Sequence, residues 1–68
     1  MSTSVGQQLR RAREARSLTL EQVSQSTLIR VHYLRALEEG DFGILPSAVQ
    51  ARGFLRTYAD LLHLDVED

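Results

Sequence analysis

The chain has 68 residues and a mass of 7.7 kDa, which is enough for a single small domain spanning residues 1–68. Its content of 43% hydrophobic and 25% charged residues is ordinary for a globular protein and argues against disorder. No apolar run approaches the ~20 residues that cross a bilayer, and the N-terminus lacks the apolar core of a secretory signal. The absence of cysteine excludes a disulfide scaffold and thiolate metal sites.

The net charge of −1 hides an asymmetry between the two halves of the chain. Residues 1–36 hold six arginines and two glutamates, whereas residues 37–68 hold two arginines and seven acidic residues. The first half is therefore suited to face an anionic partner, which the second half would repel.

Capping signals and apolar spacing predict an all-α domain of four or five short helices. Two pairs of residues have the capping-box form, Ser4 with Gln7 and Thr19 with Gln22. They predict helices over roughly 5–16 and 20–26. We expect the second helix to be short, because its Ser and Thr side chains favour local hydrogen bonds over further helix.

The second half of the chain predicts two more helices joined by a loop. A third helix is expected over 31–39, with Gly40 as its left-handed end. Phe42 and Leu45 are expected to anchor the loop in the core. Pro46 suits the first turn of a fourth helix, which we expect to run over about 46–63.

The two short helices are separated by a turn of about four residues, which is the spacing of a helix-turn-helix over about 19–40. The opening TLEQV, the inward Ile29 and the closing YLRALE resemble the Xre/Cro-type helix-turn-helix. That resemblance implies an ion pair between Arg13 and Glu38, which holds the first helix to the third. It also implies that Arg13 is not a DNA contact.

The second half of the chain carries a more discriminating pattern: the loop EGDF, a Leu-Pro pair, the block ARGFLRTYA at 51–59 and a closing Leu-x-Leu-Asp. With it, nearly the whole chain, from about Gly6 to Asp65, resembles the cytoplasmic domain of the RodZ family of bacterial cell-shape proteins. Ser17 and His63 depart from the family, which favours Gly at both turns. The resemblance implies a cytoplasmic adaptor domain, with the family's basic juxtamembrane stretch, transmembrane helix and extracytoplasmic domain outside this chain.

DNA binding is the alternative function. A helix-turn-helix reads DNA from the start of its second helix, and the positions there are Arg30, Val31, His32 and Arg35. Either arginine could reach a guanine edge, and Val31 could touch only a thymine methyl. The segment after this helix is acidic where a phosphate clamp is needed, so we expect weak binding unless the domain dimerises.

The fourth helix is predicted to be the working surface. Its apolar stripe, which includes Phe54, spans about 160° at about 100° per residue, more than the ~100° that a small core needs. Either all these side chains are core, or Phe54 and Tyr58 project toward a partner, flanked by Arg52 and Arg56. In the RodZ family the matching aromatic pair contributes to docking on MreB, the bacterial actin homologue, which favours the second interpretation. Close approach of the core or of a partner would explain Gly53 in mid-helix.

No catalytic or metal-binding chemistry is indicated. His32 and His63 lack metal-ligand spacing, and the sequence has no nucleophile elbow or Gly-rich phosphate loop. We expect no enzyme activity, no cofactor, no small-molecule substrate, and membrane association only through a segment outside this chain.

Two further aromatic residues are expected to be structural. Phe42 is expected to plug the core, and Tyr33 to be half-buried.

Overall fold

The computed structural model describes residues 4–64. Its elements are α1 (Val5–Ala15), α2 (Leu20–Thr27), α3 (Val31–Glu39), the 3-10 turn η1 (Phe42–Ile44) and α4 (Ala48–Leu61). No strand occurs within this range, so the predicted all-α class is confirmed. None of these helices is long and apolar enough to cross a membrane.

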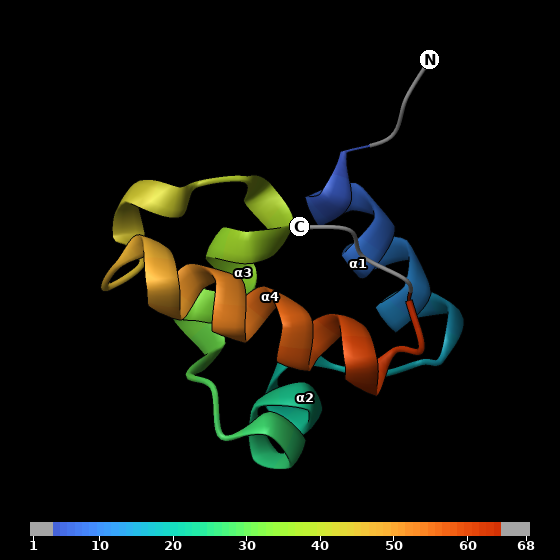
Figure 1. The fold of residues 1–68 in the computed structure, drawn as a ribbon. Coiled ribbons are helices and arrows are strands. Elements are labelled where there is room, and N and C mark those ends of the chain that lie inside the picture. The colour runs from blue at the N-terminus through green and yellow to red at the C-terminus, as the bar shows by residue number, and fades with distance from the viewer. Residues whose placement is uncertain (1–3, 65–68) are drawn as a thin grey trace.

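The helix α3 lies at the centre of the fold and contacts α1, α2, α4 and η1. Figure 1 shows α4 running across α3, with α1 beyond one end of α4 and α2 beneath it. One apolar core fills the space between the helices. Its buried members are Leu9, Val23, Ile29, Leu34, Ala36, Leu37, Leu45, Tyr58, Ala59 and Leu62.

The helix starts follow from local hydrogen bonding, as the sequence predicts. The backbone N–H of Gln7 donates to Ser4 Oγ at 3.2 Å, and that of Gln22 donates to Thr19 Oγ1 at 3.1 Å. Both Gln side chains bond back to the cap residue, so both predicted capping boxes are confirmed. Gly40 ends α3 with φ 74°, the predicted left-handed stop.

Hydroxyl side chains hold the turn between α2 and α3. Thr27 Oγ1 donates to the carbonyl of Val23 at 2.8 Å, and Ser24 Oγ donates to the carbonyl of Ile29 at 2.6 Å. Between them Leu28 adopts a left-handed conformation with φ 64° and is 89% exposed. These bonds end α2 at Thr27, one residue beyond the expected end.

Two expectations about the loop before α4 are wrong. Ser47 is the N-cap of α4 and accepts the backbone N–H of Gln50 at 3.1 Å, so Pro46 precedes the helix instead of lying in its first turn. Phe42 is 53% exposed and does not plug the core. The turn η1 is too short to bury both apolar residues, and Leu45 takes the buried position.

The two turns where the RodZ family favours Gly adopt backbone conformations that favour Gly. Ser17, after α1, has φ 55°, and His63, after α4, has φ 57°. Side chains other than Gly are disfavoured there because Cβ crowds the following carbonyl. Both turns therefore carry a side chain where the backbone favours Gly, at a cost in local strain.

Candidate docking site on α4 and its support

The carboxylate of Glu38 joins three helices inside the domain. Glu38 is 5% exposed, near the end of α3. Arg13 of α1 contacts it through Nε at 2.7 Å and Nη2 at 3.1 Å, so the expected ion pair is present. Arg10 contacts it at 3.2 Å, and the hydroxyl of Tyr58 on α4 donates to it. This network fixes the position of α4 relative to α1 and α3.

The network also fixes the charge states of its members. Burial alone would raise the pKa of Glu38, but hydrogen bonds from Arg13, Tyr58 and Arg10 outweigh burial and hold the pKa below its usual range. The hydrogen bond to Glu38 raises the pKa of Arg13. Burial, followed by the bond to the anionic Glu38, raises the pKa of Tyr58. The carboxylate is therefore ionised and the phenol neutral around pH 7.

The expectation that Tyr58 projects toward a partner is wrong. Its side chain is 0% exposed and belongs to the core. The physical reason lies in the helical wheel of α4, where Tyr58 falls about 20° from the centre of the apolar stripe and Phe54 falls at its edge. The Glu38 carboxylate satisfies the phenolic hydroxyl, which makes full burial tolerable.

Phe54 lies half-buried at the edge of the solvent-facing side of α4. On the far part of this side, about 140–160° around the helix from Phe54 at about 100° per residue, lie Val49, which is 81% exposed, and the exposed Arg52 and Arg56. Apart from its neighbours along the helix, no heavy atom lies within 4 Å of a Cβ built on Gly53, so the core does not explain this glycine. We call the surface formed by Val49, Arg52, Gly53, Phe54 and Arg56 the outer face of α4.

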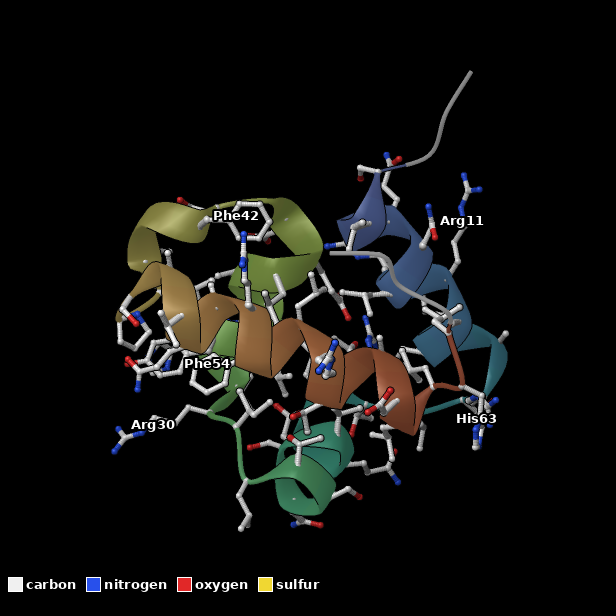
Figure 2. All side chains as sticks on the ribbon, in the orientation of Figure 1. Arg11, Arg30, Phe42, Phe54 and His63 are labelled. Carbon is white, nitrogen blue, oxygen red and sulfur yellow. The ribbon has the colours of Figure 1, made fainter. Side chains whose placement is uncertain are left out.

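A shallow apolar groove of about 510 Å³ adjoins this face. It runs between η1 and the first half of α4, and Arg52 lies at its rim. Its lining residues are Phe42, Gly43, Leu45, Ser47, Ala48, Ala51, Arg52 and Leu55. The exposed ring of Phe42 belongs to this groove and projects above α4 in Figure 2.

The start of α3 presents the residues expected to meet DNA. Arg30, His32 and Arg35 are exposed, and Val31 is half-buried. Figure 2 shows Arg30 projecting from the domain on the same side as Phe54. Glu21 lies in the first turn of α2, whose N-terminal N–H groups are partly occupied by the capping box. An acidic side chain there opposes a phosphate contact.

Sequence reasoning missed the structural role of Gly6. A Cβ at this position would lie 2.2 Å from the carbonyl oxygen of Glu38, so only Gly lets α1 approach α3 this closely. The available signal was a glycine inside a predicted helix, where it costs about 1 kcal/mol relative to Ala. Among the described residues, no group of three or more His, Asp or Glu side chains could hold a metal ion.

Comparison with known proteins places this architecture in a family. Residues 8–68 match the family model described as a helix-turn-helix domain. The cytoskeleton protein RodZ of Streptococcus pneumoniae is 39% identical over 62 residues, which cover 91% of this chain and 22% of that protein. The chain belongs to the RodZ-like helix-turn-helix domains. It spans about a fifth of the length of the curated relatives it matches.

Two further relatives of the RodZ-like domain are YmfM proteins. The membrane protein YmfM of Bacillus subtilis is 36% identical over 50 residues, which cover 74% of this chain and 17% of that protein. A solved structure of YmfM from Staphylococcus aureus, described as a candidate DNA-binding membrane protein, superposes with a TM-score of 0.88. It is 32% identical and covers 93% of this chain and 77% of the solved chain.

Proposed function

We propose that this chain is a non-catalytic adaptor domain that docks on MreB filaments through the outer face of α4. The observation that carries the proposal is the composition and exposure of this face. Val49 is 81% exposed, and the helix backbone is bare at Gly53. Exposed apolar side chains beside open backbone are typical of a surface that a protein partner covers. The similarity to the cytoskeleton protein RodZ supports a cytoskeletal partner.

Each residue of the outer face has a distinct role in this docking. Val49 and the exposed edge of Phe54 supply the apolar contact area, with Phe54 as the aromatic anchor. Arg52 and Arg56 pair with acidic groups on the filament and orient the domain. Gly53 lets the partner approach the helix backbone. Tyr58 acts from within, because its bond to Glu38 fixes the helix that presents these side chains.

Co-sedimentation with polymerised MreB from the same organism tests the proposal. We expect the 68-residue chain to pellet at tens of micromolar, and Val49→Ala, Arg52→Ala and Phe54→Ala to pellet less. Val5→Ala and Arg11→Ala are matched controls, because Val5 and Arg11 are exposed on α1, away from α4.

Circular dichroism of every variant shows whether the helices are retained. Lack of pelleting by the unmodified chain would refute the proposal. Equal loss of pelleting in the α1 and α4 variants would also refute it, since the effect would then not be specific to α4.

Sequence-specific DNA binding through α3 is the second candidate function. The exposed positions of Arg30, His32 and Arg35 favour it, as does the description of the YmfM structure. In this case binding to a DNA duplex falls steeply with salt, and Arg30→Ala or Arg35→Ala abolishes it. A flat salt dependence, or no retardation of DNA at low salt, would exclude this function.

A further inference from the structure

We propose that the docking surface continues from α4 onto α3 through a row of three stacked rings, and that its partner is an acidic protein surface. The rings belong to Phe54 on α4 and to Tyr33 and His32 on α3. This inference rests on the function proposed above. It adds that the start of the recognition helix, with Arg30, serves protein binding and not base reading.

The three rings form a continuous surface across the two helices. The Tyr33 and Phe54 rings are stacked, with centroids 5.5 Å apart and an interplanar angle of 23°. The His32 ring lies 4.1 Å from the Tyr33 ring, tilted by 50°. Phe54 and Tyr33 are half-buried and His32 is exposed, so one edge of the row faces solvent. A partner that covers Phe54 therefore also meets the rings of α3.

Basic groups lie at both ends of this surface. Arg52 and Arg56 lie on the outer face of α4. Around the helix they are farther from the row of rings than Gly53 and Val49 are. At the other end Arg30 is the N-cap of α3, and its side chain makes no capping hydrogen bond. Between the row and these arginines α4 also exposes Gln50, Thr57 and Asp60, so the surface is mixed in character. The arginines at its two ends complement a protein surface that carries carboxylates.

The surroundings of α3 suit a protein better than a nucleic acid. A helix-turn-helix on DNA needs phosphate contacts beside the recognition helix. Here the first turn of α2 carries Glu21, and the turn before α3 carries Leu28, which is 89% exposed. A carboxylate and an exposed leucine oppose contact with phosphates, whereas an exposed leucine is an ordinary part of a protein contact.

The test measures the affinity of the 68-residue chain for MreB filaments at constant ionic strength. We expect His32→Ala and Arg30→Ala each to weaken binding about fivefold, as truncation of an interface contact does. Arg11→Ala and His63→Asn are the matched controls and should bind as the unmodified chain does. Both control residues are exposed and lie at the opposite end of the domain from Phe54 in Figure 2. Asn suits position 63 because it tolerates the left-handed conformation there.

Three outcomes would overturn this inference. If the α4 variants lose binding while His32→Ala and Arg30→Ala do not, docking is confined to α4 and the proposed function stands. If the unmodified chain does not bind filaments, the inference and the proposed function both fail. If the α3 variants keep filament binding but lose a salt-dependent affinity for a DNA duplex, the start of α3 serves nucleic acid.

Discussion

Tyr58 on α4 donates its hydroxyl to the same carboxylate oxygen of Glu38 that the Nε of Arg13 contacts from α1. An aromatic residue in a block shared with RodZ proteins is therefore part of the structural support of the domain. In the proposed docking it acts only through the position of α4. Phe54, one helical turn earlier, is the member of the pair that reaches the surface.

Replacing Tyr58 by Phe tests this support. The variant keeps the packing of the ring and loses the hydrogen bond to a charged acceptor, so we expect the free energy of unfolding to fall by about 2 kcal/mol. Urea denaturation followed by circular dichroism measures the change. Tyr33→Phe is the control, since Tyr33 is half-buried on the surface of α3, and its stability should change little. Equal losses in the two variants would contradict the assignment.

The buried carboxylate makes stability depend on pH at the acid end. The pKa of Glu38 is lowered from 4.5 in the folded domain, so on acidification the unfolded chain takes up this proton first. The stabilisation is complete above about pH 5 and is lost as the pH falls through the lowered folded pKa. Thermal unfolding between pH 7 and pH 2 should show this loss. Glu38→Gln should be less stable by about 3 kcal/mol at pH 7 and have a shallower acid limb.

Gly6 and Gly53 should respond oppositely to the same substitution. Gly6→Ala drives a methyl group into the backbone of Glu38 and should destabilise the fold by about 2 kcal/mol or more. Gly53→Ala places its methyl in open space within α4 and should stabilise the fold by about 1 kcal/mol. Chemical denaturation of both variants checks the signs. On the proposed docking surface Gly53→Ala also weakens filament binding, although the domain is more stable.

The left-handed turn after α1 offers a route to greater stability. Ser17→Gly removes the unfavourable contact of Cβ with the following carbonyl and should raise the free energy of unfolding by about 1 kcal/mol. Ser17→Ala keeps the Cβ and should not stabilise the domain. The melting temperatures of the two variants distinguish relief of strain from loss of the serine hydroxyl.

The helices and most of their ends could be predicted because their signals are local. Ser4 and Thr19 each cap a helix through a partner three residues away, and Gly40 stops one through its own backbone. The approach of α1 to Glu38 depends on residues far apart in sequence. The resemblance supplied the Arg13–Glu38 pair, whereas nothing in the local sequence reports the backbone contact at Gly6.

The errors at Tyr58 and Phe42 have different physical origins. The width of the apolar stripe on α4 shows that some side chains remain outside without showing which. A hydroxyl near the centre of the stripe requires a buried acceptor. Glu38, which the resemblance pairs with Arg13, is such an acceptor. Phe42 lies in a turn without periodicity, where the sequence does not indicate which of two apolar residues faces inward.

The central position of α3 has a consequence for how the domain opens. Because α3 contacts every other helix, detaching any one of them exposes part of its buried stripe, which includes Leu34 and Leu37. Partly opened forms are then costly, and the helices lose their hydrogen bonds together. Amide protons in the centres of α1, α3 and α4 should therefore exchange with deuterium at rates set by a single global opening.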